Sequence, residues 1–318
     1  MRKLLGIITL IAAAITVAAF GYNFANGKSS DAKSSDVGRP PDMQLEKLEI
    51  SDIQSSDVGR IPIDADRFLD LLRFRLSDAI ACKKIEGRPI AGVVNHHALA
   101  SDLLARFFKS LKLSRPDLKR LIIISPDHFK QGYQAVGFGD VDYQSDGKII
   151  KTDKVLAETF KKELPEFDNE FLLKEHGIGA LIPFAAREFS DLSILPIVVR
   201  ADASRSELIK LGQKLASIMD GQTMVIISAD MSHYLSAEQA LKNDEVTLSW
   251  FLHNDGNALF RASDDNIDSG PALLALLTMF EQLKIEPQFT LLNHSISSRY
   301  GGSQDNTTSY ITGFWAAE

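Results

Sequence analysis

The segment Leu121–Phe129, LIIISPDHF, constrains the fold of this chain more than any other. Four consecutive apolar residues, three of them isoleucine, precede Ser125 and Pro126. A continuous apolar run bounded by turn residues indicates a strand that is buried on both faces of a sheet. Pro126 has no N–H to donate, so the strand must end close to it. His128 therefore follows the carboxyl end of a central strand, which is the edge at which open α/β sheets bind ligands.

Two further segments repeat this design, Ala91–His97 (AGVVNHH) and Met224–His233 (MVIISADMSH). They place His96 and His233 just past the ends of two more buried strands, and His176 precedes a predicted helix. Neutral imidazole is the commonest metal ligand in proteins. The three strand-end histidines converge only if their strands are neighbours in the sheet. The pattern therefore favours a metal site, and a capped turn or a satisfied buried imidazole is the alternative for each histidine.

Helical patterns alternate with these strands. Apolar residues recur at helix spacing over Asp64–Ile85 and Ala98–Leu111, and Ser204 and Glu207 form a capping box at the start of another helix. We also expect a short hairpin within residues 132–150 and one continuous helix over Ile178–Phe189. This alternation predicts an α/β fold, a three-layer sandwich with a mostly parallel central sheet.

Charge and cysteine content exclude some classes of function. The formal net charge is −7, and no basic run occurs in the folded part, so we expect no nucleic-acid partner. The single cysteine, Cys82, excludes an intrachain disulfide framework and a cysteine-rich zinc cluster. The sequence also lacks a nucleophile elbow, a P-loop and a dinucleotide-binding fingerprint in a matching context.

The N-terminus predicts a membrane association. Arg2 and Lys3 precede an uncharged run, Leu4–Tyr22, within residues 1–22. Its length favours a transmembrane anchor over a cleaved signal peptide, and the basic flank places the rest of the chain on the extracytoplasmic side of the cell membrane. If the run is cleaved, the protein is secreted. Residues 23–62 read as a disordered linker rich in Ser, Asp, Lys and Gly, and residues 63–318 as the folded domain.

An ordered series of short motifs identifies a family. The segments are AGVVNHHALA, IIISPDHF, EHGIGALIPFA, LPIVV, VIISADMSHY and DNTTSYITGFW. Together, from Ile90 to Trp315, they resemble the MEMO family, whose microbial members are also called AmmeMemoRadiSam system protein B. The resemblance implies a fold similar to the class III extradiol (LigB-type) non-haem iron dioxygenases. It also implies a pocket that binds iron or copper.

The resemblance also assigns residues to this pocket. His96, His128 and His233 match the family's metal-liganding histidines. Glu175 and His176 match its acidic–histidine pair, and Asp230 matches the aspartate of its fourth motif. The family has a cysteine, a proposed ligand, before a proline-started helix.

This chain departs from that last motif, because the corresponding stretch reads Asn266-Ile267-Asp268-Ser269-Gly270-Pro271. Asp268 is the nearest group able to ligate. A carboxylate in place of a thiolate moves the preference from copper(I) toward iron(II), manganese or zinc.

These observations predict a membrane-tethered metal-binding protein, and leave open whether it is an enzyme. In the enzymatic hypothesis, the metal acts as a Lewis acid or redox centre in a dioxygenase-like reaction. His176 would then be the general acid–base and Glu175 would orient it. In the alternative hypothesis, the pocket belongs to a non-enzymatic module that binds a peptide or a small molecule. A scaffold whose site has decayed is a third reading, which the missing cysteine favours.

Overall fold

The computed structural model describes residues 82–130, 134–145 and 147–317. The predicted anchor or signal peptide (1–22) and the predicted linker (23–62) lie outside the described residues. Most of the helix predicted over Asp64–Ile85 also lies outside them, and its last four residues, 82–85, are not helical. Across the described part of the chain, none of the helices combines the length and the apolar character needed to cross a bilayer.

The described residues form a nine-stranded sheet with the order β4-β5-β6-β2-β7-β1-β9-β8, and β3 pairs with β6. Its centre is parallel, because β6, β2, β7 and β1 run in one direction. Antiparallel strands close it on both sides: β9 pairs with β1, β8 with β9, and β4 with β5. The strands are β1 (Arg88–Val94), β2 (Arg120–Pro126), β3 (Val136–Phe138), β4 (Tyr143–Ser145), β5 (Lys148–Thr152), β6 (Ser193–Val199), β7 (Thr223–Ser228), β8 (Gln288–Ile296) and β9 (Ser309–Ala317).

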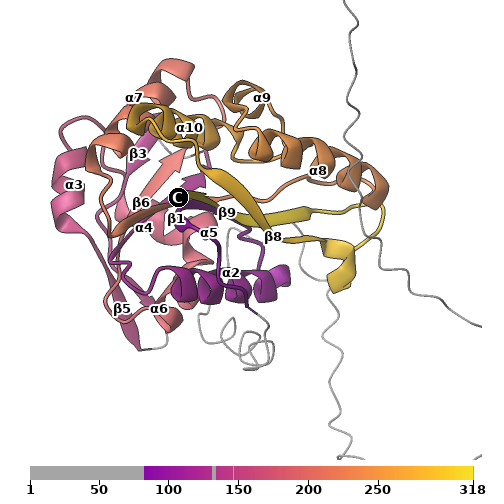
Figure 1. The fold of residues 1–318 in the computed structure, drawn as a ribbon, viewed down its shortest axis with the longest axis horizontal. Helices are drawn as coiled ribbons and strands as arrows, with labels where there is room; N and C mark the ends of the chain where they lie inside the picture. The colour runs from indigo at the N-terminus through magenta and orange to yellow at the C-terminus, as the bar shows by residue number, and fades with distance from the viewer. Residues whose placement is uncertain (1–81, 131–133, 146, 318) are drawn as a thin grey trace, which may run out of the picture. The chain divides into compact units, whose positions relative to one another are not determined.

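Helices cover both faces of this sheet, which gives three layers (Figure 1). Alternate residues of each strand enter different cores, since successive side chains of a strand point to opposite faces. Ile122 and Ile124 of β2 pack with α7 and α10. Leu121 and Ile123 pack with α2 and α6. The predicted α/β fold with a large central sheet is confirmed, with the parallel pairing confined to the central strands and to the β5–β6 pair.

The helices of the described residues follow the predicted positions in most cases. They are α2 (Ser101–Ser114), α3 (Lys154–Phe160), α4 (Asn169–Lys174), α5 (His176–Gly179), α6 (Ile182–Glu188), α7 (Arg205–Ile218), α8 (Ala237–Leu252), α9 (Gly256–Phe260) and α10 (Gly270–Leu283). The capping box of Ser204 and Glu207 is present at the start of α7. Helix α10 is buried along nearly its whole length because α7 and α9 pack on it in addition to the sheet.

One local prediction was wrong, and a second was incomplete. The segment Ile178–Phe189 is not one helix, because Pro183 has no N–H to continue the turn before it and instead begins α6. In the predicted hairpin region, β4 and β5 do form a hairpin, but β3 pairs with β6. Sequence spacing cannot reveal that pairing, because β6 lies more than fifty residues further along the chain.

Candidate metal centre

The candidate centre lies at the carboxyl edge of the parallel strands. Strand β7 lies between β2 and β1, so the carboxyl ends of these three strands are adjacent. His96 follows β1 by two residues, and His128 follows β2 by two residues. Because β1 and β2 are both parallel to β7, these two histidines leave the sheet at the same edge. The strands that carry the histidines are therefore neighbours in the sheet, which the sequence alone could not establish.

Three histidines meet at this edge: His96, His128 and His176. One ring nitrogen from each lies within 4.8 Å of those of the others. The rings of His96 and His128 are 4.7 Å apart between centroids and nearly perpendicular, at 86°. The ring of His176, at the first position of α5, lies 3.8 Å from that of His128 and is tilted by 36°. His176, predicted to lie beside the metal as an acid–base, therefore lies within the histidine group itself.

Glu175 fixes the orientation of His128. Its Oε1 is 2.6 Å from Nδ1 of His128, and its Oε2 accepts the backbone N–H of His128 at 3.2 Å. Glu175 is fully buried and also caps α5 by accepting the N–H of Gly177. Nδ1 of His176 is further away, at 3.8 Å. The sequence paired the Glu175 carboxylate with His176, but in the fold its main hydrogen-bonding partner is His128.

Asp268 approaches the same point from the loop before α10. Its Oδ2 lies 3.3 Å from Nε2 of His96 and 3.9 Å from Nε2 of His128. Its backbone N–H donates to the carbonyl of Asp230, which ties the loop to the end of β7. Both carboxylate oxygens are buried, and apart from the contacts of Oδ2 with the two histidines neither has a partner within the described structure. The residue predicted to take the place of the family's cysteine is therefore adjacent to two of the three histidines.

His233 is not part of the three-histidine group. Its ring contacts that of Tyr234, with centroids 5.7 Å apart, and its charge acts on His97 and Asp230. Asp230 accepts the backbone N–H of His96 through Oδ1 at 3.1 Å. The metal-ligand role assigned to His233 from the sequence stays a prediction.

Burial and charge set the protonation of the centre. Burial alone lowers the pKa of His96, but the carboxylates of Asp230 and Asp268 outweigh it and raise the pKa to about 9. Burial, reinforced by the positive charges of His128 and His96, lowers the pKa of His176 to about 3, so this imidazole is neutral at neutral pH. Burial raises the pKa of Glu175, but its hydrogen bond from His128 and the charge of that residue bring it below its usual value.

Unpartnered polar atoms concentrate at this edge. Among the described residues, eight buried side-chain polar atoms have no hydrogen-bond partner, and five of them belong to the strand ends and loops around the histidines. These five are Asn95 Oδ1, His176 Nδ1, His233 Nδ1, Asp268 Oδ1 and Asp268 Oδ2. Buried polar groups are normally paired, so such a cluster calls for a missing partner. Nitrogen and carboxylate donors around one point suit a divalent cation.

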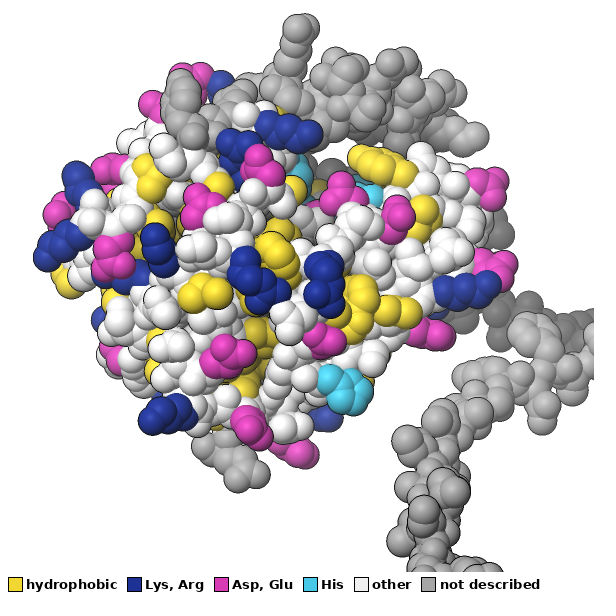
Figure 2. Space-filling model, turned by 90° about the horizontal axis from the view of Figure 1, so that it is seen from above, with side chains coloured by type: hydrophobic (Ala, Val, Ile, Leu, Met, Phe, Trp, Pro, Cys, Tyr) yellow, Lys and Arg dark blue, Asp and Glu magenta, His cyan; other side chains and the backbone are white. Residues whose placement is uncertain are grey.

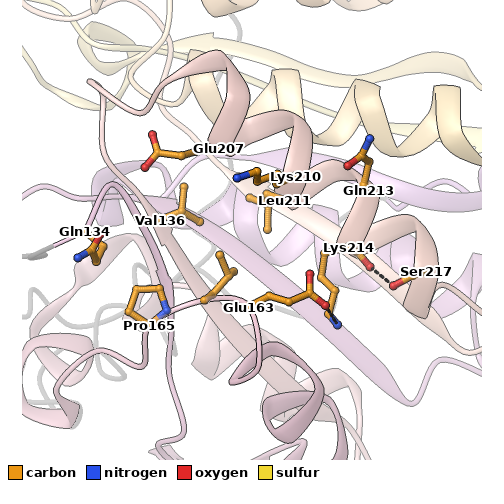
Figure 3. A pocket seen from close by; sticks show the side chains of 11 residues that line it. Gln134, Val136, Glu163, Pro165, Glu207, Lys210, Leu211, Gln213, Lys214 and Ser217 are labelled. Carbon is orange, nitrogen blue, oxygen red and sulfur yellow. Dashed lines mark hydrogen bonds and ion pairs between the residues drawn. The ribbon is translucent and has the colours of Figure 1, made fainter.

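A separate cavity of about 570 Å³ lies beside α7 (Figure 3). It is lined by α7, by residues 134–136 and by the loop after α3, and none of its lining residues is a histidine. Two of its charged residues form a pair, since Lys214 contacts Glu163 at 2.6 Å. On the face seen in Figure 2, basic and acidic side chains are interspersed.

Fold and site define a class: an α/β protein with a histidine- and carboxylate-lined site at the carboxyl edge of a parallel sheet. The family model described as "Memo-like protein" matches residues 78–314, more than half of the chain. The chain belongs to the Memo-like family, which is of the class III extradiol dioxygenase type.

Two curated relatives match this chain over most of its length. A MEMO1 family protein of Pyrobaculum aerophilum is 26% identical over 246 residues, covering 74% of this chain and 86% of its own length. A MEMO1 family protein of Pyrobaculum arsenaticum is 27% identical over 246 residues, which again cover 74% of this chain and 86% of its own length. A solved structure of an uncharacterized protein from Escherichia coli K12 aligns with 71% of this chain and 99% of its own, at 15% identity and a TM-score of 0.45.

Proposed function

We propose that this protein binds a divalent metal ion between His96, His128 and Asp268, with His176 beside the ion. The observation that carries the proposal is the carboxylate of Asp268, which is buried, has no partner at Oδ1, and faces only Nε2 of the two histidines with Oδ2. A buried carboxylate without hydrogen-bonding partners is costly, because the desolvation of the charge is poorly compensated. A cation held there also by two imidazole nitrogens would compensate it.

The donor set decides which ions fit. Two imidazoles and one carboxylate form the ligand set of non-haem iron(II) sites, and they also suit manganese and zinc. Copper(I), which the family resemblance also suggests, prefers the thiolate that this chain lacks. When bound, such an ion supplies a Lewis-acid centre, and iron supplies a redox centre as well.

The residues around the ion have distinct parts in the proposed chemistry. Glu175 holds His128 in place through its 2.6 Å contact. His176 is neutral at neutral pH and its Nδ1 has no hydrogen-bond partner, so this nitrogen would accept a hydrogen bond from a substrate hydroxyl and orient it at the site. We propose on this basis a dioxygenase-like oxidoreductase acting on a small oxygen-bearing substrate.

Metal analysis tests the proposal directly. The full-length chain, purified in mild detergent and reconstituted with iron(II), manganese(II) or zinc(II) in turn, should retain about one ion per chain after dialysis. His128→Ala should lose it, because one of only a few ligands is removed. His253→Ala is the matched control, since His253 lies at the exposed end of α8 and bonds only within that helix. A wild-type chain without metal, or a His128→Ala chain that retains it, would sink the proposal.

We further propose that residues 1–22 tether the domain to the cell membrane on its extracytoplasmic side. The support is the uncharged run Leu4–Tyr22 behind Arg2 and Lys3. The full-length chain should stay with the membrane fraction through a high-salt wash. Recovery of the intact chain, with its own N-terminus, in the soluble fraction would contradict this.

A further inference from the structure

His96 and His128 both face Asp268 through Nε2. The other ring nitrogen of each, Nδ1, contacts a different side chain. A neutral imidazole carries its hydrogen on one nitrogen and its lone pair on the other. A metal ion binds only the nitrogen with the lone pair. The partner at Nδ1 therefore decides whether Nε2 is able to bind a metal at all.

For His128 the partner is a carboxylate, which only accepts hydrogen bonds. Nδ1 must therefore carry the hydrogen that it donates to Glu175 at 2.6 Å. Nε2 is left with the lone pair, on the side of Asp268.

For His96 the partner is a hydroxyl, and a further contact fixes its role. Ser228 Oγ, at the end of β7, is 3.0 Å from Nδ1 of His96 and 2.5 Å from the carbonyl oxygen of Gly177. A carbonyl oxygen only accepts, so the one hydrogen of the hydroxyl lies on the bond to Gly177. Toward His96 the hydroxyl is then an acceptor, and Nδ1 of His96 must donate. Nε2 of His96 is left for the metal.

Both arrangements depend on the same three residues, 175–177. Glu175 holds His128 directly, and the Gly177 carbonyl directs the Ser228 hydroxyl that holds His96. The segment is itself fixed, because the N–H of Gly177 donates to Glu175 Oε1 at 3.0 Å. The backbone carbonyl of Ser228 also accepts the hydroxyl of Ser269, the residue after Asp268.

We propose that Ser228, directed by the carbonyl of Gly177, is a positioning residue that fixes the metal-binding tautomer of His96. This inference rests on the proposed metal site and adds to it a residue outside the ligand set. Without the Ser228 hydroxyl, the neutral ring that forms when His96 gives up a proton to bind the ion is free to keep its hydrogen on Nε2 and to donate it to Asp268. With a hydrogen on Nε2 the ring cannot bind the ion. The hydrogen must first move to Nδ1, and this cost weakens the metal affinity.

Ser228→Ala, with Ser125→Ala as its matched control, tests the inference with cobalt(II) as the probe. Ser125 is equally buried at the end of the neighbouring strand β2, but its hydroxyl bonds the carbonyl of Pro126 and no histidine. Both variants lose one buried hydroxyl, so the metal-free proteins should lose similar amounts of thermal stability. Full-length wild type and variants are titrated with cobalt(II), and the visible ligand-field spectrum reports both the affinity and the ligand set.

We expect Ser228→Ala to bind cobalt(II) about 10–100-fold more weakly than wild type, with an altered spectrum. Ser125→Ala should stay within about threefold of wild type and keep its spectrum, because it leaves the tautomer of His96 in place. Equal losses in both variants, or an affinity and spectrum of Ser228→Ala equal to wild type, would overturn the inference. Failure of the proposed function is distinguishable, since then wild type binds no cobalt(II) or His128→Ala binds it as tightly.

Discussion

The two edges of the parallel sheet differ in how their buried polar groups are paired. At the amino edge, Arg115 is almost completely buried and donates to the carbonyls of Pro89 at 2.5 Å and Gly221 at 2.8 Å. Arg88 pairs with Asp117 there, and Arg120 bonds Thr223. At the carboxyl edge, Asp268, His176 and other side chains leave buried polar atoms without partners.

The difference shows where the fold is made stable and where it is made for binding. A buried cation that is matched by carbonyls and a carboxylate holds the starts of β1, β2 and β7 together. The ends of the same strands bring together histidines and carboxylates that the protein alone leaves unsatisfied. Violations of packing and pairing rules concentrate at functional sites, and here they concentrate at one edge.

Arg115→Met should break the amino edge and give the largest effect. The change leaves the buried carbonyl of Pro89 without its donor and leaves Arg88 as the remaining partner of Asp117 and Gly221, so the free energy of unfolding should fall by about 3 kcal/mol. Metal binding at the other edge should persist. Urea unfolding measures the stability, and the metal content of the purified variant measures the binding. Lys151→Met, at an exposed position on β5, is the control and should change stability by less than about 0.5 kcal/mol. A loss below about 1 kcal/mol in Arg115→Met would show that the two edges do not differ in this way.

Glu175→Gln should break the carboxyl edge without a comparable loss of stability. The amide keeps the shape but not the charge that holds Nδ1–H of His128, so zinc(II) affinity should fall about 10–100-fold. Competition titration with a chelator measures it. Glu170→Gln, on the preceding helix and in an exposed pair with Lys174, is the matched control and should bind as wild type. Equal affinities in the two variants would remove Glu175 from the site.

Gly177→Ala and Gly221→Ala compare one glycine at each edge. A Cβ on Gly177 would lie 2.2 Å from Oγ of Ser125, whereas one on Gly221 would meet only the end of Arg88, at 3.9 Å. Gly177→Ala should therefore cost about 1–3 kcal/mol of stability, and Gly221→Ala much less. Thermal melts of both metal-free variants measure this. Adding Ser125→Ala to Gly177→Ala should recover part of the loss, and no recovery would place the strain elsewhere.

Asp117→Asn should give the smallest effect, visible only in acid. Burial raises the pKa of Asp117, but hydrogen bonds from Arg88 and Arg115 outweigh it and bring the pKa below its usual value. A lowered pKa in the folded state stabilises the protein above the unfolded value near 3.8, and the gain is lost as the pH falls through the folded pKa. Because Asp117 is partly exposed, the effect should be about 1 kcal/mol or less. Unfolding at pH 6 and pH 3 should differ less in Asp117→Asn than in wild type. An unchanged difference would remove Asp117 from the acid response.

Residues at strand ends were predictable from the sequence, and residues brought in by packing were not. His96 and His128 follow apolar runs whose ends are marked by local chemistry, so their positions at one edge could be inferred. His176 follows no strand. It enters the histidine group because α5 packs beside β2, a contact between segments some fifty residues apart. Ser228 was not singled out from the sequence, because nothing in its own neighbourhood signals a bond to Gly177.

The sequence by itself determined the layers, the buried parallel strands and the histidines at their ends. Those features depend on periodicity, turn residues and proline, which act over a few neighbouring residues. Only the tertiary structure decided that β7 lies between β2 and β1, that Glu175 holds His128, and that Asp268 faces two histidines. These arrangements depend on which surfaces bury each other across the chain, and that choice is made by the packing of the whole core rather than by any local pattern.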